Sequence, residues 1–92
     1  MKLLNVEPSP IRTKKWRATF DDGTKTDFGA RGMKDYTQHH DEHRRSRYIK
    51  RHIKDLDTRD PTRAGYLSMF LLWGNYTSLE KNIKAYKELF HL

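Results

Sequence analysis

The sequence predicts an α+β fold in which a small N-terminal three-stranded antiparallel sheet packs against three to four C-terminal helices. Within the first 30 residues apolar and polar side chains alternate, which is typical of half-buried strands. Beyond residue 34 the apolar side chains recur at helical spacing instead. Strands that are followed by helices, without alternation between the two, indicate an α+β domain with one face of the sheet covered.

The whole chain, residues 1–92, is predicted to form a single domain, with a β-meander over 1–30 and a helical part over 34–92. Hydrophobic residues make up 35% of it, which leaves a thin core of the kind that partners often complete. Cysteine is absent, so disulfides and thiolate metal ligands are excluded. The N-terminal residues lack the pattern of a signal peptide, and we expect an intracellular protein.

The first two strands are predicted at residues 2–6 and 15–20. In the second of them Trp16, Ala18 and Phe20 share one face, which we expect to be buried. Two prolines between the strands exclude a helix there and indicate a turn.

A hairpin is predicted to follow the second strand. A three-residue loop that ends at Gly23, in the left-handed region, would set Trp16 opposite Phe28 and keep both rings on the core face. A two-residue turn would instead place Asp27 opposite Ala18 on that face, so the longer loop is the better prediction.

Residues 29–32 hold two glycines around Arg31 and are predicted to form the turn that leads from the sheet to the helices. A backbone nest for phosphate is the alternative, but the spacing matches neither the P-loop nor the dinucleotide-binding motif. A short helical turn over residues 34–38 is expected next, with Tyr36 presented on it.

The following predicted helix, residues 41–54, carries the candidate binding site. Asp41 suits its N-terminal end, and after residue 42 no acid follows until Asp55. Basic side chains recur along it at helical spacing. The candidate residues for binding a polyanion or an acidic partner are Arg44, Arg47, Lys50, Arg51 and Lys54. A second stripe, made of Ile49, Ile53 and Leu56, is expected to face the core.

The densest apolar run lies between Asp60 and Gly74 and is predicted to be one buried helix. Asp60 is expected to cap its first turn, and Pro61 suits the first helical position. Gly74 is expected to end the helix in the left-handed conformation. The run is too short to span a bilayer, which needs about 20 apolar residues.

A last helix is predicted from the capping-box spacing of Thr77 and Glu80. It would place one apolar stripe on the core and its lysines largely on the opposite side. The residues of that stripe are Leu79, Ile83, Tyr86 and Phe90.

Most of the aromatic side chains are predicted to belong to the core, rather than to platforms for stacking bases. Tyr36, Tyr48 and Tyr76 stand next to polar neighbours and are expected to be freer. The aromatic residues assigned to the core are Trp16, Phe20, Phe28, Phe70, Trp73, Tyr86 and Phe90.

The letters H-x-x-E-H occur at residues 39–43, a pattern in which two histidines on a helix bind zinc and a glutamate activates its water. The chain offers no evident third ligand and little room for a substrate cleft, so we assign no metal and no catalytic residue. No other enzyme motif is present, and we predict a protein without enzymatic activity or cofactor. A compact nuclease that uses His and Asp without a motif is the open alternative.

Several stretches form a combined pattern over nearly the whole chain. They include Phe-Asp-Asp-Gly-Thr-Lys at 20–25, Arg-Ser-Arg-Tyr at 45–48, Asp-Pro at 60–61 and Leu-Leu-Trp-Gly at 71–74. With them the chain resembles a family of short uncharacterised proteins encoded by large DNA viruses of eukaryotes, the nucleocytoplasmic large DNA viruses. The resemblance implies a viral origin, and it carries over no activity and no catalytic residue.

The charge predicts an anionic partner, since 19 Lys and Arg against 12 Asp and Glu give a formal net charge of +7. With the resemblance, this predicts a non-enzymatic viral structural protein. It would be a minor capsid or internal virion component that holds an acidic protein surface or the genome through its basic helix. The alternative is a nucleic-acid-binding protein without sequence specificity that acts during infection.

The expected partners are therefore other virion proteins or DNA, with no small-molecule substrate. The expected locations are the virion and, during infection, the host cytoplasm or viral factory. A role at the membrane surface is disfavoured, because the cationic and the apolar features lie on different helices. An oligomeric or assembled state stays open.

Overall fold

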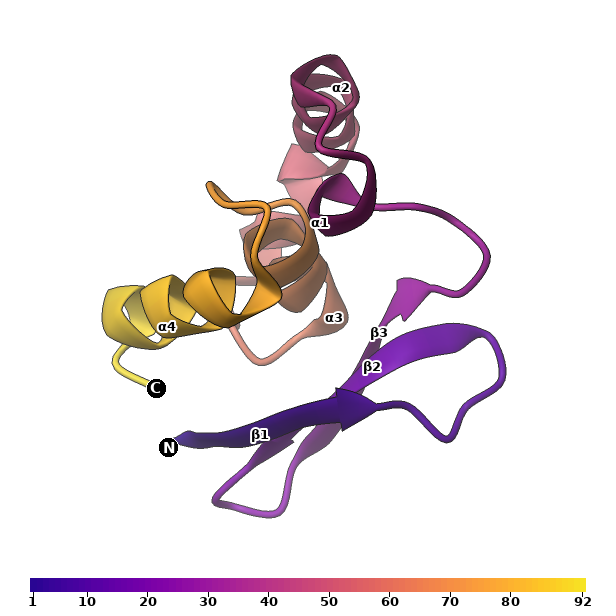
Figure 1. Cartoon of the computed structure of the whole chain (residues 1–92). Helices are drawn as coiled ribbons and strands as arrows, with labels where there is room; N and C mark the ends of the chain where they lie inside the picture. The colour runs from indigo at the N-terminus through magenta and orange to yellow at the C-terminus, as the bar shows by residue number, and fades with distance from the viewer.

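The computed structural model describes residues 1–92 and confirms the predicted α+β class. Strands β1 (Leu3–Pro8), β2 (Lys14–Phe20) and β3 (Lys25–Ala30) form one antiparallel sheet in the order β1-β2-β3. The helices follow the sheet and lie over one of its faces (Figure 1). β1 runs two residues further than predicted, to a proline that an edge strand tolerates.

The β2–β3 hairpin has the predicted register, in which Trp16 pairs with Phe28. Gly23 has a φ of 90°, as the three-residue loop requires. The loop is closed by the amide of Phe20, which donates to the carbonyl of Thr24 at 2.9 Å, and by the amide of Gly23, which donates back to the carbonyl of Phe20 at 3.0 Å. The alternation of the sequence therefore fixes which face of the sheet is buried.

The turn after β3 is the predicted connection rather than a phosphate nest. Gly29 and Gly32 both have positive φ, at 81° and 95°. The side chain of Arg31 between them reaches back along the sheet, where its guanidinium donates to the carbonyls of Lys14 and Ser9. Arg31 is thus used to hold the turn and is not free for a ligand.

Six helical segments follow the sheet. They are α1 (Tyr36–His39), α2 (Glu42–His52), the 3₁₀ helix η1 (Ile53–Thr58), α3 (Ala64–Leu67), the π-helical turn η2 (Ser68–Leu72) and α4 (Leu79–Phe90). The basic helix is therefore shorter than the predicted 41–54, and η1 takes the place of its last two residues and of most of the expected polar connector.

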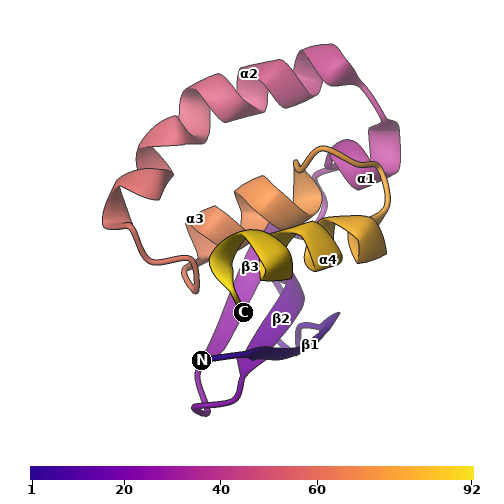
Figure 2. The same ribbon diagram turned by 90° about the vertical axis from the view of Figure 1, so that its left-hand side faces the viewer.

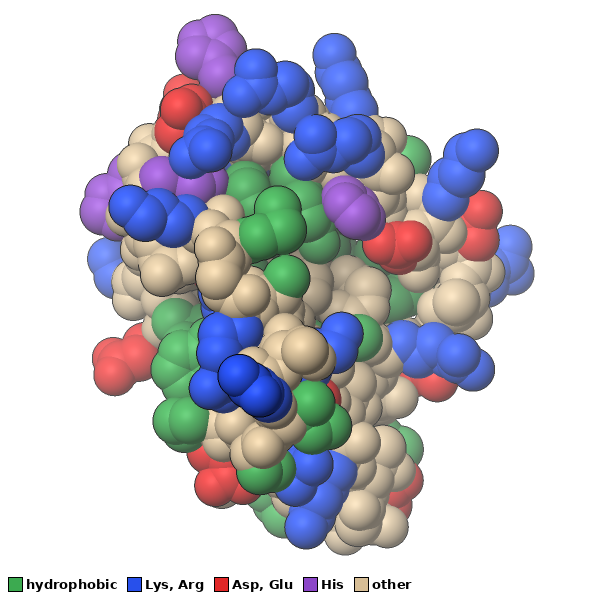
Figure 3. Space-filling view, turned by 90° about the vertical axis from the view of Figure 1, so that its right-hand side faces the viewer, with side chains coloured by type: hydrophobic (Ala, Val, Ile, Leu, Met, Phe, Trp, Pro, Cys, Tyr) green, Lys and Arg blue, Asp and Glu red, His purple; other side chains and the backbone are tan.

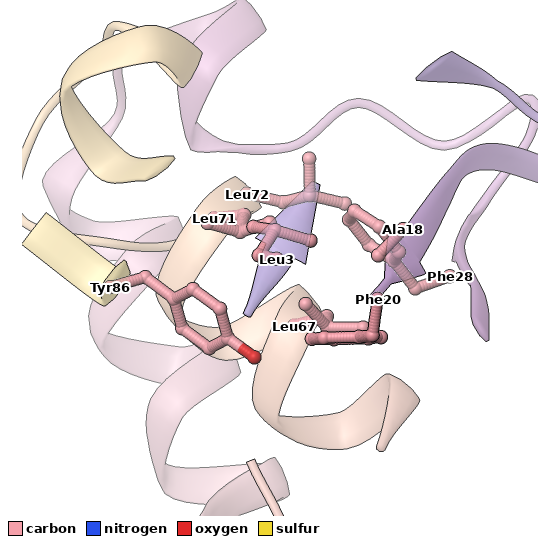
Figure 4. Packing of buried hydrophobic residues seen from close by; sticks show 8 residues of the cluster. All are labelled: Leu3, Ala18, Phe20, Phe28, Leu67, Leu71, Leu72 and Tyr86. Carbon is pink, nitrogen blue, oxygen red and sulfur yellow. The ribbon is translucent and has the colours of Figure 1, made fainter. Parts of the chain in front are cut away.

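The core lies between the sheet and the layer formed by α3, η2 and α4 (Figure 4). Its members are Leu3, Ala18, Phe20, Phe28, Leu67, Leu71, Leu72 and Tyr86. The hydroxyl of Tyr86 donates to the carbonyl of Pro61 at 2.5 Å, and burial raises the pKa of this phenol. The two ends of the chain meet beside the core, where the amide of Leu3 donates to the carbonyl of Leu92 at 2.9 Å.

The helix predicted between Asp60 and Gly74 consists of α3 and η2, which together we call the central helix. It begins later than predicted. Its regular part starts at Ala64, because Asp60 caps a separate turn before it: the Asp60 carboxylate accepts from the amide of Thr62 at 3.0 Å and from its hydroxyl at 2.6 Å. At the other end the helix widens into η2, which the amide of Trp73 closes on the carbonyl of Ser68 at 3.1 Å. The buried face that the apolar run predicted is confirmed.

The prediction of a left-handed Gly74 is wrong, and close packing is the reason for a glycine there. A Cβ atom at this position would lie 2.7 Å from Oδ1 of Asn82. Asn82 is 1% exposed, and its Nδ2 donates to the carbonyls of Leu71 at 3.0 Å and Tyr76 at 2.8 Å. Its Oδ1 accepts from the amide of Tyr76, so this one side chain ties the central helix to α4.

α4 begins one residue later than the predicted capping box. Its cap is Ser78, whose hydroxyl accepts from the amide of Lys81 at 3.3 Å, so Thr77 and Glu80 do not form the predicted pair. The apolar stripe is confirmed, because its residues belong to the core or pack against it. These residues are Leu79, Ile83, Tyr86 and Phe90.

α2 stands apart from the rest of the helical layer (Figure 2). It contains no buried residue, and its closest backbone neighbours are α1 and η1. The prediction that Ile49, Ile53 and Leu56 face the core is wrong for Ile53, which is 51% exposed, while the other two are half-buried. Burial of apolar surface therefore contributes little to holding this helix in place.

Candidate functional site

Helix α2 positions the candidate binding residues, and Asp41 fixes its start. The Asp41 carboxylate accepts from the amide of His43 at 2.9 Å and from that of Arg44 at 3.2 Å. These two hydrogen bonds, the one from Arg44 first, hold the pKa of Asp41 below its usual value. Basic residues fill the last turn, where they meet the negative end of the helix dipole.

Three of the five predicted binding residues line a hollow of about 510 Å³ beside α2. We call it the basic hollow; its lining residues are Lys15, Ala30, Met33, Lys34, Asp35, Arg44, Arg47, Tyr48, Arg51, His52 and Trp73. The structure thus brings Arg44, Arg47 and Arg51 together. Lys50 and Lys54 are exposed but lie outside the hollow, and Lys54 is on η1 rather than on α2.

The charges of the basic hollow are mostly unpaired. Lys15 is the exception, because its Nζ lies 2.7 Å from Oδ2 of Asp35 and donates to Oε1 of Gln38 at the same distance. The other cations form no salt bridge within the protein. They are Lys34, Arg44, Arg47 and Arg51. On this face, Lys and Arg side chains gather along the upper part, where α2 lies, around exposed hydrophobic and His side chains (Figure 3).

A stack of aromatic rings forms one wall of the basic hollow. The rings of Tyr48 and Trp73 lie 4.3 Å apart and 5° from parallel, and those of Tyr48 and His52 lie 4.2 Å apart at 24°. Trp73 also packs against His39, with ring centroids 5.2 Å apart. Burial raises the pKa of the Tyr48 phenol, so this ring is neutral well above physiological pH.

The three tyrosines that were expected to be freer than the core aromatic residues differ in their exposure. Tyr36 is 8% exposed, so the expectation is wrong for it. It is buried because α1 packs its ring under Arg45, whose guanidinium carbon lies 5.5 Å from the ring centroid. Tyr48 is half-buried in the stack, and Tyr76 is 47% exposed.

Arg45 has a structural role that the charge pattern did not distinguish from its neighbours. Its Nε donates to the carbonyls of Trp73 at 3.1 Å and Gly74 at 2.8 Å, and one terminal nitrogen donates to Oδ1 of Asn75 at 3.0 Å. These carbonyls stand at the C-terminal end of the central helix, where a cation is favoured. Arg45 therefore fastens α2 to the central helix and is not available to a ligand.

The H-x-x-E-H stretch does not form one helix. α1 ends at His39, and His40 has a φ of 55° in the link to α2, so His39 and His43 lie on different helices. Nδ1 of His39 accepts from the amide of Asp41 at 2.9 Å, and burial lowers the pKa of this imidazole. No group of three or more His, Cys, Asp or Glu side chains is placed to hold a metal ion.

Comparison with known proteins places the chain in a family but gives that family no activity. The chain belongs to DUF5754, a family of unknown function, whose model matches residues 4–52, just over half of the chain. The match covers the sheet except for its first residue, together with α1 and α2, and so includes the arginines of the basic hollow. No curated protein and no solved structure matches the chain.

The sequence pointed to the arginines that line the basic hollow, but it did not indicate the aromatic stack that forms the wall beside them. It assigned Trp73 to the core alone, and it gave Lys34 and His52 no role. One signal was present in the sequence: Tyr48 and His52 stand four residues apart, directly after Arg47 and Arg51. At helical spacing this places the two cations in one stripe of the helix and the two rings in the stripe beside it.

Proposed function

We propose that this protein is a non-enzymatic binding protein that holds a polyanion against the basic face of α2. The observation that carries the proposal is the set of cations around the basic hollow that have no acidic partner: Lys34, Arg44, Arg47 and Arg51. Like charges that line one hollow repel one another, and solvent only screens them. An external anion would remove the repulsion and make charge-assisted hydrogen bonds to the guanidinium groups.

The carboxylate that lines the basic hollow, Asp35, supports binding rather than catalysis. Asp35 is 3% exposed and is committed to the fold, because it pairs with Lys15 and also accepts from the amide of Thr37 at the start of α1. A general acid or base must be free to exchange a proton with a substrate. No carboxylate of the hollow is left for this role in the site we propose.

The phosphate backbone of nucleic acid is the partner we propose first. Lys50 and Lys54 would extend the contact beyond the hollow along the exposed side of α2 and η1. Contacts of this kind position a protein on nucleic acid without reading its sequence. If about five phosphates are neutralised, log affinity for duplex DNA should fall with log salt at a slope of about −4 to −5.

A salt titration of binding to a labelled duplex tests this proposal. We expect the affinity to decrease steeply between low and moderate ionic strength. A flat response, or no binding to DNA or to heparin at low salt, would contradict it.

None of the helices combines the length and apolar character that a membrane span requires.

The resemblance to proteins of large DNA viruses supports a more specific proposal about where this binding takes place. We propose a minor capsid or internal virion component whose basic helix holds the genome or an acidic protein surface. A thin core of eight fully packed residues suits a protein that neighbours complete. Quantitative mass spectrometry of purified particles tests this: presence in stoichiometric amounts is expected, and absence from the particles would contradict it.

A further inference from the structure

The stack of rings beside the basic hollow has one closed end and one open end. At the closed end His39 is packed between Trp73 and Tyr36, with ring centroids 5.2 and 6.4 Å away. Tyr48 has both faces covered, by Trp73 and by His52. His52 is the last ring, its side chain is 41% exposed, and it lines the hollow. A further planar ring can therefore extend the stack at His52.

Cations and these rings form two neighbouring stripes on the side of α2 that lines the hollow. Arg47 and Arg51 directly precede Tyr48 and His52, and Arg44 stands one turn before Tyr48. Single-stranded nucleic acid offers a partner to both stripes, because a charged phosphate and a planar base repeat along it. The hollow of about 510 Å³ also falls within the range of about 300–1,000 Å³ that is usual for sites of small organic groups.

We infer that the basic hollow holds a nucleotide unit of a single-stranded nucleic acid, with its base stacked on His52 and its phosphates among Lys34, Arg44, Arg47 and Arg51. This rests on the proposed function and narrows it. A duplex hides the faces of its bases inside its own stack, so it would use only the cations. An acidic peptide would also use the cations but would leave the open ring unused.

Fluorescence anisotropy with a labelled oligothymidine of about ten nucleotides tests the inference, because sites for single strands span about 4–16 nucleotides. We expect the single strand to bind at least about fivefold more tightly than a duplex of the same length at the same salt. An oligomer with the same phosphates but no bases should lose this advantage, since a stacked base contributes about 1–3 kcal/mol, or a factor of about 5 to 150.

The variant His52→Ala removes the open ring and leaves every cation of the hollow in place. Its affinity for oligothymidine should fall about fivefold or more, while its affinity for the duplex stays the same. His52→Phe keeps a ring and should retain the preference, which also controls for loss of the contact with Asp55. The matched control is His43→Ala, an exposed histidine of the same helix outside the hollow, which should change neither affinity.

The outcomes separate this inference from the function on which it rests. Equal affinity for single strand and duplex, with His52→Ala harmless, would overturn the inference and leave a binding site for phosphates. Competition by polyglutamate as strong as that by oligothymidine at equal charge would also overturn it, in favour of an acidic protein partner. Failure of the parent protein to bind oligothymidine, duplex or heparin would contradict both proposals.

Discussion

The molecule has two regions that are built in different ways. One, which we call the body, consists of the sheet, α3, η2 and α4, and it contains all eight residues of the core cluster. The other, the arm, consists of α2 and η1 and contains no buried residue. The body therefore supplies the free energy of folding, and the arm supplies exposed cations that the fold does not need.

A few specific contacts join the arm to the body. Arg45 donates to the carbonyls of Trp73 and Gly74, and Tyr48 stacks on the ring of Trp73. A helix with no fully buried residue should open locally at a lower free energy than the core. Basic character alone therefore does not mark the residues available for binding, because Arg45 on the same helix is bonded to the body while Arg44, Arg47 and Arg51 are not.

The largest expected effect comes from a truncation in the body. Phe20→Ala removes a ring that is 1% exposed and should lower the free energy of unfolding by about 3–5 kcal/mol. Ile53→Ala in the arm removes a side chain that is 51% exposed and should cost less than about 1 kcal/mol. Chemical denaturation of both variants measures the contrast, and similar losses would mean that the arm is part of the core.

A buried polar residue of the body should come next. Asn82→Ala leaves the carbonyls of Leu71 and Tyr76 without their donor and should lower the free energy of unfolding by about 1–3 kcal/mol. The exposed neighbour Lys84→Ala on the same helix serves as the control and should have little effect. Thermal denaturation compares the two variants, and equal stability would mean that Asn82 does not join the central helix to α4.

The contact between arm and body should have a smaller effect on global stability and a clear local one. Arg45→Gln removes the guanidinium that bonds to Trp73, Gly74 and Asn75, at an expected cost of about 1–2 kcal/mol. Hydrogen exchange should speed up at the amides of α2 while those of β2 keep their protection. Uniform acceleration over both elements would show that the two regions unfold together.

The smallest expected effect is a pH dependence at the junction of α1 and the arm. Burial first, and then the charge of Arg44, lower the pKa of His39 from its usual 6.5. The unfolded state then takes up a proton before the folded state does, so stability is complete above pH 6.5 and falls as the pH decreases below that value.

Denaturation between pH 7 and pH 5 measures this decrease. His39→Asn can still accept from the amide of Asp41 but does not titrate in this range, so its stability should depend less on pH. An equal slope in the parent and in this variant would remove His39 as the cause.

The sequence was sufficient for the parts of the fold that depend on periodicity and turn chemistry. The alternation of Trp16, Ala18 and Phe20 and the loop at Gly23 predicted the hairpin and its register. The apolar run predicted the buried face of the central helix, but not its π-helical end. Gly74 lies two residues after that end and packs closely against Asn82, a contact that no local pattern in the sequence predicts.

Of the candidate site, the sequence indicated the charges but not the assembly. It pointed to Arg44, Arg47 and Arg51 through their helical spacing, and it could not separate them from Arg45, which bonds to the body. It also could not place Trp73 beside Tyr48, because that contact links two helices 25 residues apart in the chain. Long-range contacts of this kind follow from the packing of the whole chain and not from a local pattern.

We infer that Arg44, Arg47 and Arg51 serve binding and not folding, and one pair of variants tests this inference. In the first, Arg44, Arg47 and Arg51 are all replaced by Gln; in the second, the same number of exposed charges is removed from α4 by Lys81→Gln, Lys84→Gln and Lys87→Gln. Both helices keep good helix formers. The free energy of unfolding and the affinity for nucleic acid are measured on each.

We expect the arm variant to be as stable as the parent or slightly more so, because like-charge repulsion is reduced, and we expect its binding to collapse. The α4 variant should keep most of the affinity. An arm variant that unfolds, or that binds as well as the α4 variant does, would contradict the account.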